Sequence, residues 1–381
     1  MTDVLEAPAT EVEVAACVAD AARAGRRLQI VGGGTRLALG RPVSADATLS
    51  TARLDGVTLY EPEALTLVAG AGTRVADVER LLAAEGQRLP FEPMDHRALL
   101  GSTGEPTLGG MVAVGASGPA RIARGACRDS LIGVRFVDGR GTVVKNGGRV
   151  MKNVTGYDLV KLMCGAYGTL GVLTEVAFKL LPLPETVATL RLDGLEDDRA
   201  VAALSAALGS PFDVTGAAHW PGRGTFVRIE GFAASVAYRA ERLAETLRPF
   251  GVAAAEDDPQ VWTAIRDARP VAEGAGAVWR VSVRPSDAPA VAARIAPDAA
   301  LYDWGGGLLW FRIAENADAG AAALRAAVDA RGGHATLVRA DAPTRRAVPP
   351  FHPEKPPVAA LSAGLRAKFD PAGVLNPGRM G

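Results

Sequence analysis

Cysteine and histidine, which supply most metal sites, are scarce in this chain of 381 residues. The three cysteines, Cys17, Cys127 and Cys164, lie far apart and form no Cys-x-x-Cys pair, and there are only four histidines. An iron–sulfur cluster needs about four thiolates, and a zinc site needs closely spaced Cys or His ligands. We therefore expect no metal site in this chain and a reducing environment around it.

Net charge and long apolar runs are also lacking. The 42 basic residues balance the 42 acidic ones, which argues against a generally basic nucleic-acid binder, and the 48% of apolar residues excludes a disordered chain. No stretch approaches the roughly 18 apolar residues of a membrane-spanning helix. The N-terminal stretch is acidic, unlike a secretory signal. We expect a soluble cytoplasmic protein that contacts a membrane only through partners, at its inner face.

Glycine, in contrast, is abundant and unevenly distributed. Of the 44 glycines, 16 lie between Gly101 and Gly171. Glycine allows a close approach of backbone to a ligand and also allows tight turns. The density alone therefore leaves two interpretations open: backbone wrapped around a large ligand, or a series of turns.

The pattern of apolar and turn residues predicts a protein of the α+β class. Residues 10–24 are expected to form a helix between an N-cap at Thr10 and a C-cap at Gly25, and residues 73–85 a helix capped by Thr73. Pro182 and Pro184 indicate a domain boundary. Further helices are expected at 198–207, 234–249, 258–268, 288–295, 318–331 and within 359–381, and strands at RLQIV, 65–69, 131–137, 142–144, 171–181, ATLRL, FVRIEGF, AVWRVSV, LLWFRI and ATLVR.

Residues 31–35 (VGGGT) follow a predicted strand and could present successive N–H groups to a pyrophosphate. They do not form a Rossmann fingerprint, because the third glycine would fall at Leu37, and the absence of any Gly-Lys dipeptide excludes a Walker A loop. Ser117 in VGASGP does not fit a nucleophile elbow. Taken alone, this motif favours an ordinary turn.

Three further motifs follow in order: TLGG with GASG at 107–118, CRDSLIG with GYDLVKLMCGAYGTLGVLTE at 127–175, and KFDPAGVLNPGRM at the C-terminus. With VGGGT, they resemble the vanillyl-alcohol-oxidase-type (PCMH-type) family of FAD-binding flavoproteins. The resemblance implies a two-subdomain PCMH-type FAD-binding domain at 1–182 and an α+β cap domain with an antiparallel sheet at 183–358. The C-terminal tail, 359–381, is expected to return to the FAD-binding domain.

The resemblance also implies which residues hold the cofactor. Backbone N–H groups of the first loop would hold the pyrophosphate, the second loop would run along the flavin, and two residues after the third loop would contact the adenine or ribose. Asn376 would lie near the isoalloxazine ring. The implied FAD-binding residues are Gly32, Gly33, Gly34, Thr35, Thr107, Leu108, Gly109, Gly110, Gly115, Ser117, Gly118, Gly171, Val172 and Asn376. No histidine lies in VGGGTR, so non-covalent FAD is expected.

Within the family, the sequence is most similar to the short FAD-binding subunits of bacterial glycolate oxidases, which implies a larger flavin subunit and an iron–sulfur subunit as partners and a small 2-hydroxy acid as substrate of the complex. Catalytic members carry a His-x-Gly-Asp-Gly-Asn type motif, and none of the histidines here lies in one. An electron-relay or assembly role is therefore expected, and no catalytic residue is assigned. A stand-alone FAD-dependent 2-hydroxy-acid dehydrogenase and a non-redox structural subunit remain as alternatives.

Four residues outside these motifs are also of interest. His96 lies between the flavin loops and could act as a base or serve a structural role. Trp304 and Trp310 could cover the flavin or pack in the core. Arg312 could clamp a carboxylate or be solvated.

Overall fold

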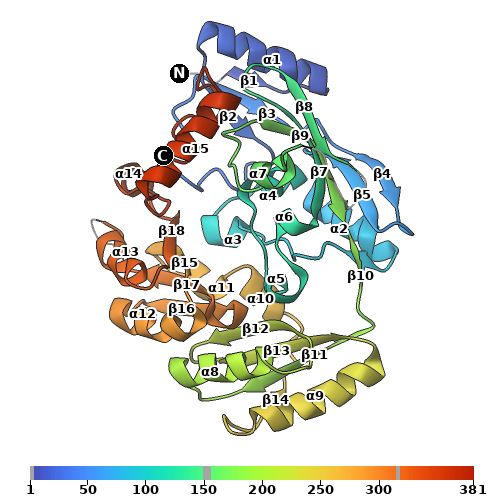
Figure 1. Cartoon of the computed structure of the whole chain (residues 1–381), viewed down its shortest axis with the longest axis vertical. Helices are drawn as coiled ribbons and strands as arrows, with labels where there is room; N and C mark the ends of the chain where they lie inside the picture. The colour runs from blue at the N-terminus through green and yellow to red at the C-terminus, as the bar shows by residue number, and fades with distance from the viewer. Residues whose placement is uncertain (1–3, 149–155, 315–317) are drawn as a thin grey trace.

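The computed structural model describes residues 4–148, 156–314 and 318–381, and it places their strands in four sheets. Residues 149–155, within the stretch that carries part of the family resemblance, lie outside the described residues. The N-terminal half holds three small sheets, and a large antiparallel sheet follows (Figure 1). The α+β class expected from the sequence is confirmed. The boundaries at 182 and 358 stay predictions.

Two sheets build most of the N-terminal half. A parallel sheet contains β1 (Val4–Glu6), β3 (Ala47–Ser50) and β2 (Leu28–Val31), in that order. An antiparallel sheet contains β4 (Val57–Glu61), β5 (Thr66–Gly70), β9 (Val172–Lys179), β7 (Leu131–Val137) and β8 (Val143–Gly147), in that order. The short strands β6 (Gln87–Arg88) and β10 (Leu181–Pro182) pair beside them.

Helices cover these sheets and complete two apolar cores. The helices of this half are α1 (Glu11–Ala24), α2 (Val75–Ala84), α3 (Arg97–Leu100), α4 (Leu108–Val114), α5 (Arg121–Arg124), α6 (Cys127–Ser130) and α7 (Leu159–Met163). One core joins α2, α4 and α7 to the five-stranded sheet, and the other joins α1 to the parallel sheet. The C-terminal tail extends the parallel sheet, because Leu28 and Leu375 form a parallel bridge.

The large sheet has eight strands and carries helices on its outer side. Its strands, in order, are β14 (Ala254–Ala255), β11 (Thr186–Leu192), β13 (Gly224–Gly231), β12 (Val214–Trp220), β16 (Ala299–Asp303), β17 (Leu308–Ile313), β15 (Ala277–Ser282) and β18 (His334–Arg339). One outer core packs α8 (Asp197–Leu208) and α9 (Ala233–Leu247) on β11–β13, and a second packs α12 (Ala288–Ile295) and α13 (Ala321–Asp329) on β15–β18. A third core lies on the opposite face, where the sheet meets Leu39, Met94 and Leu99 of the N-terminal half.

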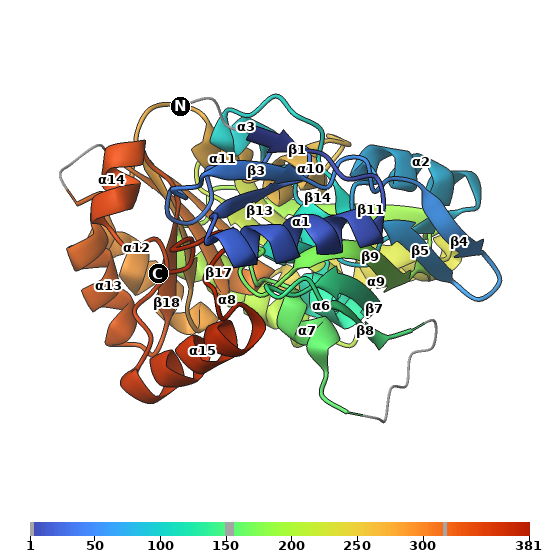
Figure 2. The ribbon, with the colours of Figure 1, turned by 90° about the horizontal axis from the view of Figure 1, so that it is seen from above.

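The last helices lie on one side of the molecule. The two views agree that α12, α13, α14 (Ala342–Ala347) and α15 (Pro356–Phe369) lie on the side opposite β4 and α2 (Figures 1 and 2). Among the described residues, no helix combines the length and the apolar character needed to cross a membrane.

Most of the expected elements are present, and three details differ. The helix expected at 73–85 is not capped by Thr73, whose hydroxyl instead bonds both backbone groups of Gly56; Arg74 is the N-cap and gives no side-chain bond. The helix expected at 258–268 is shorter, α10 (Val261–Arg266). The chain turns at Ala268, whose φ is 50°, and continues as α11 (Arg269–Ala272). The helix of the C-terminal segment starts earlier, at Pro356.

Candidate functional site

A channel with about 740 Å³ of empty space, its open mouth included, lies in the N-terminal half. Besides Thr51, segments from four distant parts of the sequence line it: 30–37 from the end of β2, 107–114 around α4, 163–173 from the end of α7, and the tail near Asn376. The glycine-rich loops are therefore gathered around one cavity.

The first loop is made of glycine because its backbone leaves no room for side chains. A Cβ on Gly32 would overlap the hydroxyl of Thr107, and a Cβ on Gly33 would overlap the carbonyl oxygen of Glu105. Gly34 has a φ of +79°, a conformation that other residues rarely adopt. Residues 32–34 are thus packed against the second loop, with their backbone exposed to the channel.

The second loop is fixed by the start of α4. Thr107 is the N-cap of α4, and its hydroxyl accepts a long hydrogen bond of 3.4 Å from the Gly110 N–H. The Gly109 N–H donates to the carbonyl of Ala71 at 2.8 Å, and a Cβ on Gly109 would lie within 3 Å of Ala71. Glycine at this position lets α4 lie directly against the chain that leaves β5.

Asn376 joins three walls of the channel. It is 2% exposed, its Oδ1 accepts from the Ile30 N–H at 2.9 Å, and its Nδ2 donates to the carbonyl of Tyr167 at 2.8 Å. Its own N–H donates to the carbonyl of Leu28 at 2.9 Å. The side chain therefore holds the tail, the first loop and the third loop together, and its φ of 42° is one that asparagine tolerates.

Two buried arginines give the channel a positive charge. Arg36 donates to the carbonyl of Met94 at 3.1 Å, and its Nε has no partner among the described residues. Arg379 donates to the carbonyls of Leu37 and Leu39. Neither guanidinium forms an ion pair with any residue of the described ranges. Burial lowers the pKa of each to about 10, as expected for a desolvated cation without a carboxylate partner.

Nine of the fourteen residues implied as FAD-binding line this channel, and five lie outside its lining. The lining includes Gly32, Gly33, Gly34, Thr35, Thr107, Gly109, Gly110, Gly171 and Asn376. Leu108 and Val172 are fully buried in the apolar cores. Gly115 is the left-handed C-cap of α4, the Ser117 hydroxyl accepts from the Cys127 N–H, and Gly118 pairs with Phe91. The individual roles of all fourteen stay predictions.

Sequence reasoning missed Arg36, Tyr167 and Arg379 as lining residues. Arg36 directly follows VGGGT, and Arg379 belongs to the terminal LNPGRM segment, so both were adjacent to quoted motifs. Their burial is what distinguishes them, and a sequence rich in arginine does not show which of its arginines are buried.

His96 is enclosed and neutral. It is 3% exposed, and its Nδ1 has no hydrogen-bond partner within the described ranges. Burial, reinforced by the charge of Arg36, lowers its pKa to about 3. His96 does not line the channel. An enclosed position of this kind is a structural position rather than that of a base with access to a substrate.

The other histidines have different environments. His219 in β12 contacts Thr225 at 2.9 Å and Asp197 at 3.2 Å, and His352 contacts Asp329 at 2.8 Å. His334 begins β18 and is exposed. The structural interpretation is favoured for His219, because its two ring nitrogens are both engaged within the sheet and α8.

The aromatic and basic residues considered for the cap lie at the inner face of the large sheet. Trp304 and Trp310 are 7% and 4% exposed and belong to the inner core, and the indole N–H of Trp304 donates to the carbonyl of Gly118 at 3.0 Å. Arg312 donates to the carbonyl of Glu273. Arg312 is therefore engaged by backbone, whereas Trp304 reaches across to the second loop.

Comparisons with known proteins agree with this arrangement. Residues 2–147 match the family model described as an FAD binding domain. The chain is 36% identical over 364 residues to glycolate oxidase subunit GlcE of Escherichia coli (strain K12), covering 93% of this chain and 92% of that one. It is 32% identical over 160 residues to glycolate oxidase subunit GlcD of Bacillus subtilis (strain 168), covering 42% of this chain but only 33% of that one.

Among solved structures, alkyldihydroxyacetonephosphate synthase superposes with a TM-score of 0.69 over 98% of this chain and 76% of that one. The two sequences are 16% identical, so this likeness concerns the fold alone. It supports a PCMH-type fold for the arrangement of the loops and sheets described above.

Proposed function

This chain belongs to the family of FAD-linked oxidoreductases that includes the glycolate oxidase subunits, and from that membership we propose that it is the FAD-binding subunit of a multi-subunit glycolate oxidase. The observation that carries the proposal is the 36% identity to GlcE, which extends over nearly the full length of both chains. Its partners are a larger flavin-containing subunit and an iron–sulfur subunit. Its role is electron relay or assembly in the conversion of glycolate to glyoxylate, in the cytoplasm or at the membrane's inner face.

The channel fits FAD by its shape and by its charge. Gly32 and Gly33 leave backbone N–H groups where a pyrophosphate can approach. Arg36 and Arg379, whose guanidinium groups form no ion pair within the described residues, supply positive charge for an anionic ligand. Apolar residues such as Val114 and Leu173 complete the lining. When bound, FAD supplies the capacity to accept and donate electrons, and the chain supplies position, hydrogen bonds and electrostatics.

The cofactor is held without a covalent bond. No histidine or cysteine is among the residues that line the channel in the described ranges, and the enclosed His96 lies outside it. Acid precipitation of the purified yellow protein is expected to leave a colourless pellet and a yellow supernatant. A pellet that stays yellow after washing would contradict non-covalent binding.

Assembly tests the central part of the proposal. A tagged copy of this chain, co-expressed with the larger flavin subunit and the iron–sulfur subunit, is expected to retain both on an affinity column. Reduction of an artificial dye by glycolate is expected to need the full assembly. Failure to retain either subunit, or rapid glycolate oxidation by this chain alone, would overturn the proposed role.

A further inference from the structure

Trp304 joins the large sheet to the second loop of the N-terminal half. It follows Asp303 at the end of β16, and its indole N–H donates to the carbonyl of Gly118. Its φ of 52° is unusual for tryptophan and places a bulky residue in a strained backbone conformation. Strain of this kind is often stored where a ligand binds.

Two arginines from opposite sides of the junction share this ring. The guanidinium carbon of Arg121, in α5, lies 4.3 Å from the centre of the Trp304 ring, and that of Arg280, in β15, lies 5.3 Å from it. Within residues 4–148, 156–314 and 318–381, neither guanidinium forms a hydrogen bond or an ion pair. Both side chains are partly buried. Two guanidinium cations therefore lie against one indole ring, and neither forms an ion pair within the described residues.

The carboxylates whose charges act on these two arginines already accept hydrogen bonds from backbone N–H groups. Asp303 accepts from the Trp304 N–H at 2.7 Å, and Asp129 accepts from the Ala126 N–H at 2.9 Å. Burial lowers the pKa of Arg280, and the like charge of Arg121 acts in the same direction. A cation–π contact stabilises one cation modestly and does not relieve the repulsion between two. An external anion between the guanidinium groups would relieve it.

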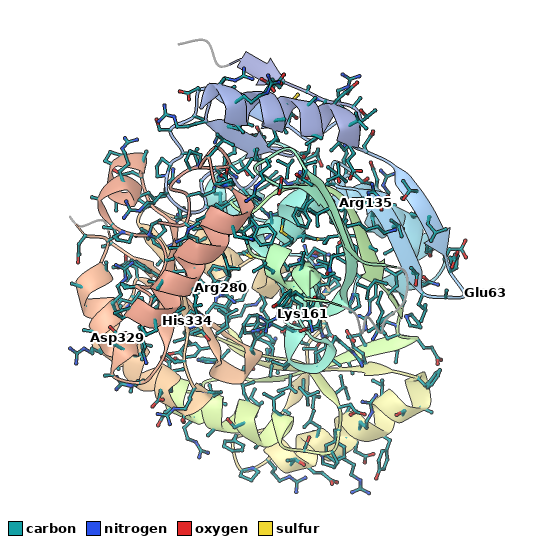
Figure 3. The ribbon with its side chains drawn as sticks, turned by 45° about the horizontal axis from the view of Figure 1, so that its top comes forward. Glu63, Arg135, Lys161, Arg280, Asp329 and His334 are labelled. Atoms are coloured by element: carbon teal, nitrogen blue, oxygen red, sulfur yellow. The ribbon has the colours of Figure 1, made fainter. Side chains whose placement is uncertain are left out.

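The position of Arg280 connects this junction with the channel. Its partners across the sheet are Trp310 and Thr336, and Trp310 belongs to the core on the face toward the N-terminal half. Figure 3 shows Arg280 near His334, which lies at the exposed start of the neighbouring strand β18. Tyr167, which lines the channel, is close enough for the charge of Arg280 to act on its phenol. The two arginines therefore lie beside the channel rather than at a remote surface.

The geometry points to a carboxylate-binding site formed by Arg121 and Arg280 beside Trp304, which takes a small hydroxy acid or the corresponding oxo acid. The inference rests on the proposed function for the class of acid, and it adds that this chain itself binds the acid. Guanidinium groups suit this ligand because they can donate two parallel hydrogen bonds to one carboxylate. The sequence suggested Arg312 as a residue that clamps a carboxylate. In this inference Arg121 and Arg280 take that role, because neither forms an ion pair within the described residues.

Calorimetric titration of the purified, FAD-loaded chain with oxalate tests the site, because oxalate carries the carboxylates and is not oxidised as a hydroxy acid. We expect saturable binding, and no binding of the uncharged probe ethylene glycol. Arg280→Met and Arg121→Met should each weaken oxalate binding by about tenfold or more, as loss of a charged hydrogen bond implies. Arg280→Lys keeps the positive charge but lacks the two parallel donors of a guanidinium group. Its affinity for oxalate should lie between those of Arg280→Met and the unchanged protein.

The matched control is Arg294→Met, because Arg294 is exposed on α12, on the outer side of the sheet. This variant should bind oxalate like the unchanged protein. The inference is overturned if oxalate does not bind, or if the Arg121 and Arg280 variants bind it as tightly as the control. Flavin absorbance and retention of the partner subunits, measured on the same preparations, report the proposed function separately. A protein that binds FAD and its partners but not oxalate would therefore contradict only the carboxylate site.

Discussion

Gly33 is the residue at which the channel is most sensitive to a side chain. Its ideal Cβ would overlap the carbonyl oxygen of Glu105, so Gly33→Ala must push the first and second loops apart. We expect this variant to lose most of its bound FAD, measured as the flavin-to-protein absorbance ratio after gel filtration.

The matched control for this change is Gly364→Ala in α15, where the added Cβ meets no atom within 4 Å. That variant should keep its flavin and gain slightly in helix stability. Equal flavin content in both variants would show that the close approach of the two loops does not govern FAD binding.

His96 gives the stability of the protein a dependence on pH. Its folded pKa is about 3, below the ordinary value of 6.5, so the unfolded chain takes up a proton between these values and the folded chain does not. The contribution of His96 is present above pH 6.5 and is lost as the pH falls. Between pH 7 and pH 5, the unchanged protein should lose about 2 kcal/mol more unfolding free energy than His96→Gln.

Urea titrations of both proteins at the two pH values measure this difference. Gly364→Ala is the control, because it adds a methyl group at an open position and leaves every titratable side chain in place, so its pH dependence should match that of the unchanged protein. Parallel losses in His96→Gln and the unchanged protein would mean that His96 is accessible to protons in the folded state.

At the scale of single elements, α1 shows how local sequence fixes a helix. The Thr10 hydroxyl accepts from the Glu13 N–H at 3.2 Å, and the Glu13 carboxylate accepts in return from the Thr10 N–H. Thr10→Ala should lower the free energy of unfolding by about 1 kcal/mol, measured by chemical denaturation. The control Thr246→Ala removes an exposed hydroxyl that bonds a carbonyl within α9 and should be nearly neutral. A comparable loss in both would contradict a specific capping effect.

The same helix explains how far the sequence could predict structure. Thr10 and Gly25 cap α1 as expected because both signals act between neighbouring residues. Thr73 fails as a cap because Gly56, 17 residues away, binds its hydroxyl. The strand β12 (VTGAAHW) was not expected, because its glycine and two alanines are poor strand formers and its place is set by pairing with β13.

The candidate site, too, was predictable only where the signal is local in the sequence. The glycine loops and Asn376 were available from the motifs, because close backbone packing demands those residue types in the sequence itself. The positive charges at the channel could not be predicted, because Arg36 and Arg379 are two of many arginines and only the fold buries them against the channel. The pair of Arg121 and Arg280 lies 159 positions apart and meets only through Trp304. Long-range placement of common residues is what a single sequence does not specify.

At the scale of the whole molecule, a buried ion network joins the large sheet to the N-terminal half. Arg228 in β13 is 4% exposed and lies 2.8 Å from Glu92 and 3.4 Å from Glu230. Glu230 in turn binds Arg88 in β6 at 2.7 Å. Among the described residues, Glu92 therefore pairs with Arg228 alone, whereas Glu230 pairs with Arg88 as well.

Removing that guanidinium should destabilise the junction as a unit. Arg228→Met leaves the Glu92 carboxylate without its ion-pair partner, and we expect a loss of about 3–5 kcal/mol in the free energy of unfolding, measured by urea denaturation. The exposed pair of Arg23 and Asp20 gives the control, since Arg23→Met should change stability by less than about 1 kcal/mol. Adding Glu92→Gln to Arg228→Met should restore part of the loss, because the uncompensated charge is removed. If the double variant is no more stable than Arg228→Met, the loss arises from packing against Trp262, 4.7 Å from the guanidinium, rather than from the unpaired Glu92 carboxylate.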